Sequence, residues 1–395
     1  MNHEIPLGAF EEALAGEIPA AVELRHRIHA EPDLGGAEER TAALVASELG
    51  VPDAPRVTEG RLIRVDVGTG PAVALRAELD GLPITETTHV PWAAHNGAMH
   101  ACGHDVHLAA LVAVVRTVRR VGGTSPLLAV LQPREESLPC GAKDMIESPL
   151  LVAEPVGAFF GTHVQAALPA GTIAAQPGPV NAASDEFTVR VAGRPGHGAY
   201  PHTTADPVVA ASAVVSTLHQ LVSRRVDPMH PTVLTVGSIS GGSAANAVAE
   251  QVTLTGTLRT FDSADRHRLH ELIRDTSELT ARANGCTATT DLALGEPVLD
   301  NDPALVESIV PLLTDRGFTT TGDHRSCGAD DFAYYGELFP TLMCFVGVDA
   351  PAGIGLHHPA FLPPDAAVTD VARAMLAGYV GACRYLSATT TEVTP

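Results

Sequence analysis

The sequence predicts an α/β protein in which a smaller second domain is inserted into a discontinuous larger one. The 395 residues exceed one compact core, since roughly 150 residues form a typical domain. The first part of the chain alternates β-rich runs with helical patterns, which is typical of βαβ units and a mostly parallel sheet. This alternation changes after about residue 180 and returns from residue 303. We therefore expect a larger α/β domain formed by residues 1–180 and 296–395, with residues 181–295 inserted.

The first part contains four predicted strands and a long predicted helix. The helix covers residues 105–121, because Leu108, Leu111 and Val115 recur at helical spacing and two glycines follow at 122 and 123. The predicted strands are residues 61–68, 72–80, 126–132 and 158–164.

The pattern of the inserted segment predicts strands and helices in the order β-α-β-β-α-β, which is ferredoxin-like. Its first helix begins at Asp206-Pro207, since an Asp at the N-cap followed by Pro is a common helix start, and it continues to about Arg225. A second helix is expected at residues 263–283. The expected strands are residues 186–191, 232–239, 251–260 and 286–294. The last part returns to a helix (303–317), a strand (341–348) and a helix (365–386).

Charge and composition exclude several classes of protein. The 25 basic and 46 acidic residues give a net charge of −21, which argues against a nucleic-acid partner. Glu4, Glu11 and Glu12 lie where a secretory signal would need basic and then apolar residues. No uncharged apolar stretch approaches the roughly 20 residues of a membrane helix. The six cysteines form no CxxC pair, so we expect them to be thiols or metal ligands. Together these observations predict a cytoplasmic protein without a membrane partner.

Residues 99–107 (MHACGHDVH) combine a thiol, imidazoles and a carboxylate at a loop-to-helix junction. Such a mixture of N, S and O donors is what an ion like Zn²⁺ selects. The alternative is a surface histidine cluster beside a buried cysteine.

Further polar residues follow the predicted strands. Glu135 and Glu136 come just after one strand, His163 is at the end of the next, and His357 lies in the loop after the strand at 341–348. In an open α/β sheet, ligands bind outside the carboxyl ends of the strands, so these groups should meet at one edge. Taken singly, each could be an exposed turn or a histidine at the edge of the core.

The inserted segment has two Gly-rich loops and a strand-end arginine. His197 lies in the first loop (193–202), Asn246 in the second (241–246), and Arg259 near the end of a strand. Arginine suits a carboxylate and histidine suits an oxyanion. Turn chemistry and a surface arginine would explain the same pattern.

Together these segments resemble the family of co-catalytic metal amidohydrolases and peptidases that includes aminoacylase and glutamate carboxypeptidase. Within it, they most resemble the hippurate hydrolases and auxin-conjugate amidohydrolases. The matching pieces run in family order over nearly the whole chain: residues 23–29 (ELRHRIH), 74–83 (ALRAELDGLP), 100–105 (HACGHD), 132–136 (QPREE), 161–164 (GTHV), 196–202 (GHGAYPH), 256–259 (GTLR), 330–333 (DDFA) and 356–361 (LHHPAF).

The resemblance implies a catalytic domain with an inserted lid domain that forms a homodimer. It also implies hydrolysis of a small N-acyl amino acid or related amide. One or two divalent ions, among Zn, Mn, Co and Ni, would be bound by Cys102, His104, Glu136, His163 and His357. Glu135 would be the general base, and Asp80 an acid that orients a ligand. His197, commonly from the partner subunit in this family, would stabilise the oxyanion, while Asn246 and Arg259 would contact the substrate.

Two departures and three alternatives accompany this interpretation. The branch usually has Asp where this chain has Glu78, and this departure affects how the metal ligands are positioned. The branch also has small residues where this chain has Ser137–Cys140 (SLPC), and this departure affects which substrate is bound. A dipeptidase or carboxypeptidase of the same family is one alternative, and a catalytically silent binding protein is another. A thiol enzyme with Cys102 as nucleophile and His104 as base is the third.

Overall fold

The computed structural model describes residues 7–392 and divides into two compact units. The first unit consists of the chain up to Gly178, Asp300–His324 and the chain from Tyr334 on. The second consists of Pro179–Leu299 and Arg325–Ala333. Among the described residues, no helix is both long and apolar enough to cross a membrane.

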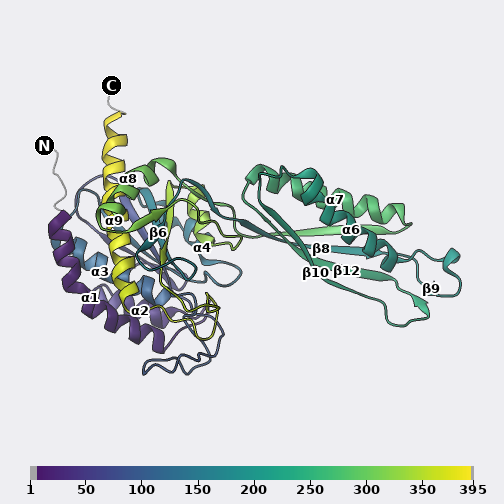
Figure 1. Ribbon diagram of the computed structural model, residues 1–395, viewed down its shortest axis with the longest axis horizontal. Helices are drawn as coiled ribbons and strands as arrows, with labels where there is room; N and C mark the ends of the chain where they lie inside the picture. Colours follow the sequence, from purple (N-terminus) through teal and green to yellow (C-terminus); the bar gives the residue numbers. More distant parts are fainter. Residues whose placement is uncertain (1–6, 393–395) are drawn as a thin grey trace. The chain divides into compact units, whose positions relative to one another are not determined.

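The first unit is built on an eight-stranded mixed sheet in the order β1-β2-β4-β3-β5-β16-β6-β15 (Figure 1). Strands β4, β3, β5 and β16 are parallel to their neighbours in this run, whereas β2 and β6 join it in antiparallel register. The strands are β1 (Arg56–Val57), β2 (Gly60–Val65), β3 (Ala72–Glu78), β4 (Leu127–Gln132), β5 (Val156–Gln165), β6 (Thr172–Ala174), β15 (Thr319–Thr321) and β16 (Thr341–Gly347). Every residue of β3, β4 and β16 is buried, as expected for parallel strands covered on both faces. The predicted α/β class with a mostly parallel central sheet is therefore confirmed.

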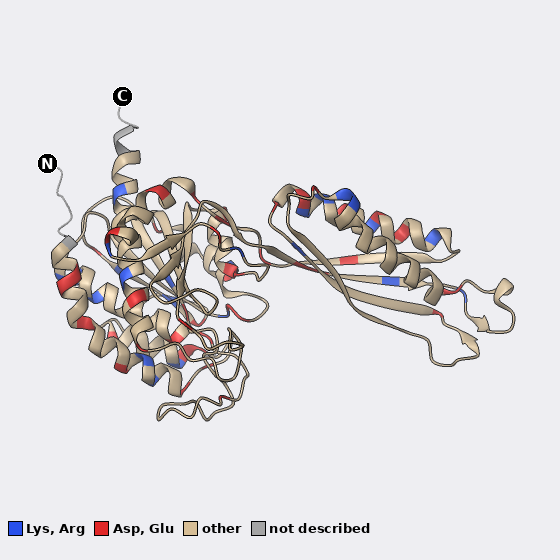
Figure 2. Ribbon diagram, in the orientation of Figure 1, with Lys and Arg blue, Asp and Glu red and all other residues tan. Residues whose placement is uncertain are grey.

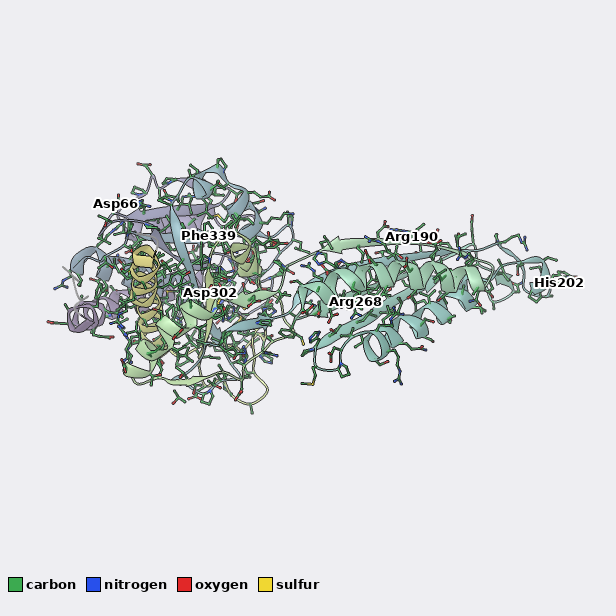
Figure 3. The ribbon with its side chains drawn as sticks, turned by 90° about the horizontal axis from the view of Figure 1, so that it is seen from above. Asp66, Arg190, His202, Arg268, Asp302 and Phe339 are labelled. Carbon is green, nitrogen blue, oxygen red and sulfur yellow. The ribbon has the colours of Figure 1, made fainter. Side chains whose placement is uncertain are left out.

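Helices α1, α3 and α9 pack against one another, and α3 and α9 also contact the central strands β3 and β5. The helices of this unit are α1 (Leu7–Ala30), α2 (Glu39–Glu48), α3 (His104–Val121), α4 (Gly141–Glu147), α5 (Pro149–Val152), α8 (Pro303–Asp315) and α9 (Ala366–Glu392). Glycines bound α3, with Gly103 at φ 83° before it and Gly122 at φ 94° after it, conformations that favour glycine. Asp302, labelled in Figure 3, caps α8 by accepting from Leu305 N at 2.9 Å. Helices α1 and α2 were not predicted from the sequence, and α1 contains Pro19, which ordinarily disfavours a helix interior.

The second unit is a four-stranded antiparallel sheet, β10-β12-β8-β13, with α6 and α7 packed together on it. Its elements are β8 (Ala183–Ala192), α6 (Pro207–Arg225), β10 (Thr232–Gly241), β12 (Gln251–Thr260), α7 (Ser263–Ala283) and β13 (Thr287–Leu294). Asp206 caps α6 by accepting from Val208 N at 2.9 Å, with Pro207 in the first turn, as the sequence predicts. Acidic and basic residues are interspersed along α7 (Figure 2). Strand β8 alternates between more and less buried residues, as a strand covered on one face should.

Short elements complete the chain. They are β9 (Gly196–His197), which pairs with β11 (Ala247–Val248), the two-stranded sheet of β7 (Gly178–Asn181) and β14 (Leu299–Asn301), and the 3-10 helices at Pro201–Thr203 and Asp331–Glu337.

Candidate metal centre

The candidate ligands of the first unit lie where its central strands end. Asp80 follows β3, Glu135 and Glu136 follow β4, His163 is near the end of β5, and His357 follows β16. Cys102 and His104 join them from the start of α3. Three overlapping groups have their ligand atoms within 4.8 Å of one another: Cys102, His104 and His163; Cys102, Glu136 and His357; and His104, Glu135 and Glu136.

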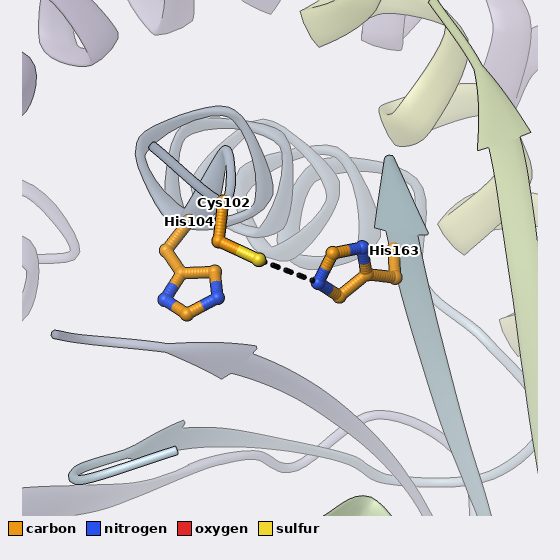
Figure 4. Close-up of side chains that lie close together, drawn as sticks. All are labelled: Cys102, His104 and His163. Carbon is orange, nitrogen blue, oxygen red and sulfur yellow. Dashed lines mark hydrogen bonds between the residues drawn. The ribbon is translucent and has the colours of Figure 1, made fainter. Parts of the chain in front are cut away.

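The sulfur of Cys102 and the ring of His163 face each other (Figure 4). Cys102 Sγ lies 3.4 Å from His163 Nε2, while His163 Nδ1 donates to the carbonyl of Val164 at 2.7 Å. The proton is therefore on Nδ1, which leaves Nε2 with the lone pair that binds a metal. Two ligands of one tetrahedral zinc ion, one sulfur and one nitrogen, would be about 3.5 Å apart.

His104 is oriented in the same way. Its Nδ1 donates to the backbone carbonyl of Asp80 at 2.9 Å, so Nε2 is the ring nitrogen that would bind an ion once it has lost its proton. Burial opposes a charge on His104, but the carboxylates of Glu78 and Asp80 outweigh it and raise the pKa of the ring to about 10. The site therefore has a field that stabilises positive charge, whether on a proton or on a metal ion.

Glu136 and His357 form the more open side of the group. Glu136 Oε1 lies 3.0 Å from His357 Nε2, and the side chains are 13% and 51% exposed. The Glu136 N–H donates to Asp80 Oδ2 at 2.9 Å. The His357 N–H donates to the Ala101 carbonyl at 2.9 Å and so ties this loop to the cysteine segment. Glu135 lies beside them, with Oε2 3.7 Å from His104 Nε2.

Two polar atoms at this site are buried without a hydrogen-bond partner among residues 7–392: His104 Nε2 and Asp80 Oδ1. Leaving such atoms unpaired is costly in a protein interior. A divalent cation would satisfy them, and the mixed thiolate, imidazole and carboxylate donors suit Zn, Mn, Co or Ni. The residues present therefore fit one or two bound ions.

The thiol-enzyme alternative fits less well. Burial raises the pKa of the Cys102 thiol well above its ordinary value, and the carboxylates of Glu136 and Glu135 raise it further. Without a cation nearby, this thiol stays protonated and is a poor nucleophile.

A buried chain of side chains behind the site was not predicted from the sequence. Arg76 pairs with Glu78, whose Oε2 accepts from His107 Nδ1 at 2.8 Å. His107 Nε2 in turn accepts from the Val164 N–H at 3.0 Å, next to His163. Glu78, where the chain departs from the related branch, is thus bonded to Arg76 and His107. The sequence feature that could have indicated this chain is His107, which lies three residues after His104 on the same helix face.

Another buried cluster uses the unassigned motif at residues 23–29. Arg25 Nε and His29 Nδ1 both donate to Asp105 Oδ2 at 3.0 Å, and His29 Nε2 lies 3.2 Å from Glu86 Oε1. Arg25 also donates to the carbonyl of Pro363 at 2.6 Å. Helix α1 is thereby joined to the residue after His104 and to the loop that follows His357.

The other predicted residues belong to the second unit. His197 in β9 pairs with Ala247 in β11, and the carbonyl of Asn246 accepts from Gly198 N at 2.8 Å, so these two loops lie together. Both side chains are exposed, as is His202 (Figure 3). His197 Nδ1 accepts from the Ala199 N–H at 3.1 Å, which leaves the ring proton on Nε2.

Arg259 is distant from that pair within the same unit. It lies opposite Ser184 at one end of the sheet, whereas Gln251 pairs with Ala192 at the end that leads to β9 and β11. Gln251 and Arg259 are eight positions apart on one strand, or about 27 Å at ~3.4 Å per residue. One copy of this unit therefore cannot bring His197, Asn246 and Arg259 to one small molecule.

Comparisons with known proteins agree with this chemistry. Residues 74–380 match the model of peptidase family M20/M25/M40. The YhaA protein of Bacillus subtilis (strain 168), an amidohydrolase by name, is 37% identical over 94% of both chains. The N-acetyl-L-cysteine deacetylase of the same organism is 33% identical over 93% of this chain and 87% of its own. An N-acetyldiaminopimelate deacetylase of Bacillus pumilus (strain SAFR-032) is 33% identical over 90% and 96%.

A solved structure extends the match to three dimensions. The YXEP protein of Bacillus subtilis, described as a dinuclear metal binding peptidase of the M20 family, has a TM-score of 0.82 at 27% identity. The match covers 93% of this chain and 98% of that one. The family model spans most of the chain, and the site has the donors that its chemistry needs. The chain therefore belongs to peptidase family M20/M25/M40 and is a metal-dependent amidohydrolase.

Proposed function

We propose that the protein hydrolyses the amide bond of a small N-acyl amino acid, with Glu135 as general base and then general acid. The position of Glu135 carries this proposal. Its Oε2 lies 3.7 Å from His104 Nε2, while the adjacent Glu136 lies 3.0 Å from His357. These distances support a division of roles in which Glu136 binds an ion and Glu135, beside the same donors, acts as the base.

The metal is assigned to five side chains, Cys102, His104, Glu136, His163 and His357, with Asp80 orienting two of them. The backbone carbonyl of Asp80 accepts a hydrogen bond from His104 Nδ1, and the Asp80 carboxylate accepts one from the Glu136 N–H. A bound divalent ion, one or two among Zn, Mn, Co and Ni, supplies Lewis-acid chemistry by lowering the pKa of water towards about 7 and polarising the amide carbonyl.

Glu135 moves the proton in this scheme. A carboxylate oxygen of Glu135 accepts a proton from the attacking water and later donates it to the departing nitrogen. Protonation of that nitrogen is needed because an amide anion is a very poor leaving group. His197 donates from Nε2 to the oxygen that becomes negative, which agrees with its Nδ1 accepting from Ala199.

The substrate is assigned by class. Two relatives are named for removing acetyl groups from N-acetyl derivatives of amino acids, which supports an N-acyl amino acid here. Within the family, the sequence motifs resemble those of hippurate hydrolases and auxin-conjugate hydrolases, which supports the same class of substrate. Arg259 binds the substrate carboxylate as a bidentate partner, and Asn246 adds a polar contact.

The separation of Arg259 from His197 and Asn246 supports a homodimer through the second unit, with that unit acting as a lid. If these residues contact one small substrate, they must come from different copies of the chain. We assign Arg259 to the subunit that holds the metal, and the His197–Asn246 loops to its partner.

The test is a substrate and metal screen. The purified, metal-depleted protein is reloaded separately with Zn, Mn, Co and Ni and assayed on N-acyl amino acids and on dipeptides. We expect one free amino acid and one acyl acid as products. Release of two amino acids would favour the dipeptidase alternative, and no hydrolysis of either class would overturn the proposal.

A further inference from the structure

We propose that Glu38 is a positioning residue for the general base, because its buried carboxylate holds the backbone of Arg134, the residue before Glu135. This inference rests on the proposed role of Glu135. It concerns a residue that does not contact the metal donors and that the sequence motifs do not include.

Arg134 has an unusual backbone conformation. Its φ is +51°, in the left-handed region that non-glycine residues rarely occupy. Such a conformation persists only where the surroundings impose it, and such residues cluster at functional sites. Here it redirects the chain directly after β4, so that Glu135 and Glu136 follow a sharp change of direction.

Both backbone polar groups of Arg134 are held. Its N–H donates to Glu38 Oε1 at 2.7 Å, and its carbonyl accepts from the Gly141 N–H at 2.9 Å. A Cβ at Gly141 would lie 1.7 Å from the Pro133 carbonyl oxygen, so only glycine allows this approach. On the other side of Glu135, the Glu136 N–H donates to Asp80. The backbone is therefore held on both sides of Glu135, by Glu38 and Gly141 at Arg134 and by Asp80 at Glu136.

The placement of Glu38 points to this use. It occupies the N-cap position of α2, yet its side chain makes no capping hydrogen bond. The Thr41 N–H near the start of that helix is instead bonded by Asp33 Oδ2 at 3.0 Å. Glu38 is fully buried, and its Oε2 has no hydrogen-bond partner in the described part of the chain. A buried acid without an ion pair in the described part of the chain is expensive to keep. Apart from the backbone of its own segment at Gly36 and Glu38, the partner of its carboxylate is the Arg134 N–H, which belongs to a distant segment.

The left-handed conformation of Arg134 allows a positioning role of Glu38 to be distinguished from a purely structural one. Glycine adopts φ near +50° without steric cost, whereas alanine does not. If Glu38 acts by holding Arg134 in this conformation, a glycine at 134 should make Glu38 dispensable. An alanine at 134, which equally lacks the side chain that pairs with Asp144, should not.

The experiment is a pair of double-mutant cycles on the metal-loaded enzyme. Glu38→Ala is measured in three backgrounds: wild type, Arg134→Gly and Arg134→Ala. In the wild type and in Arg134→Ala we expect kcat to fall by about tenfold to a hundredfold, since small misplacements of a catalytic group cost that much. KM and metal content should change little. In Arg134→Gly the further loss should be less than about threefold. Glu38→Gln, whose amide oxygen still accepts from Arg134, should keep most of kcat.

A second readout does not depend on turnover. Hydrogen exchange of the Arg134 amide should accelerate in Glu38→Ala and stay slow in Glu38→Gln. Equal losses in the glycine and alanine backgrounds, or an unchanged kcat in Glu38→Ala, would overturn the inference. If Glu135→Gln alone keeps its turnover, the proposed function fails instead. If Glu135 is the base, adding Glu38→Ala to Glu135→Gln should cause no further loss.

Discussion

Cys102 Sγ lies 3.4 Å from His163 Nε2, and this pair joins the start of α3 to the end of β5. The contact brings together two residues that are 61 positions apart in the chain. The distance suits a sulfur and a nitrogen that bind the same ion.

Cys102→Ser should lower metal affinity while leaving the fold intact. A serine hydroxyl stays protonated and binds a divalent ion poorly, whereas the thiolate is a strong ligand. The affinity should fall by at least about tenfold, because substituting even a residue that only supports a metal ligand typically costs that much. Chelator competition and elemental analysis measure it. Cys327→Ser, at an exposed cysteine, is the control and should bind metal normally. Unchanged affinity in Cys102→Ser would remove this residue from the ligands.

Glu135→Gln should keep its metal and lose turnover by about a hundredfold or more. The amide has the same shape but cannot accept a proton, and general acid–base catalysis contributes on the order of 10² to 10⁴. Steady-state kinetics with parallel metal analysis measures both properties. Glu147→Gln, at an exposed glutamate in α4, should behave as wild type. More than a few per cent of the original kcat in Glu135→Gln would show that another group is the base.

Mixed dimers should reveal whether His197 acts across the subunit interface. His197→Ala and Glu135→Gln homodimers should each be nearly inactive. In a mixed dimer with His197 acting on the partner's site, one site lacks both groups and the other lacks neither. A random mixture, in which half of the dimers are mixed, should recover about a quarter of wild-type activity. Subunit exchange verified by mass spectrometry without any recovery would mean that His197 acts within its own chain.

The stability of the first unit should fall as the pH rises from about 6.5 to 9. Burial opposes a charge on His29, but Asp105 and Glu86 outweigh it and raise its pKa from 6.5 to about 9. Because the folded-state pKa is raised, the stabilisation is complete below the unfolded value and is lost as the pH rises through the folded one. The expected loss is on the order of 3 kcal/mol at most.

Urea unfolding of the metal-free protein at pH 6.5 and pH 9 measures this effect. The chain has one tryptophan, Trp92, whose ring centroid lies 4.9 Å from that of His29, so its fluorescence reports on this region. His29→Gln should flatten the pH dependence, whereas His95→Gln, at an exposed histidine, should not. An equal pH dependence in His29→Gln would assign it to other groups.

Much of this architecture was readable from local patterns. Residues such as Asp206-Pro207 and Gly122 mark helix ends through their own backbone and side-chain chemistry, and the structure confirms them. The candidate ligands were readable because polar donors followed apolar strands, and parallel strands bring their carboxyl ends to one edge.

What could not be read depended on contacts between distant segments. Nothing near Glu38 in the sequence indicates that it bonds the backbone of Arg134, 96 positions away. The positive φ of Arg134 is likewise imposed by its neighbours in space, since arginine has no preference for it. Helix α1 contains Pro19 and is stabilised by packing on α3 and α9, so local propensity understates it.

The uneven exposure of the candidate ligands has a kinetic consequence. His357 is half exposed on a loop, whereas Cys102, His104 and His163 are buried. His357 is therefore the candidate ligand most open to solvent, and we expect the exchange rate of a bound ion to depend on this residue more than on the buried ones. The dissociation rate of the ion should therefore rise in His357→Ala by a larger factor than its equilibrium affinity falls, because the substitution removes the side chain on the solvent side of the ion.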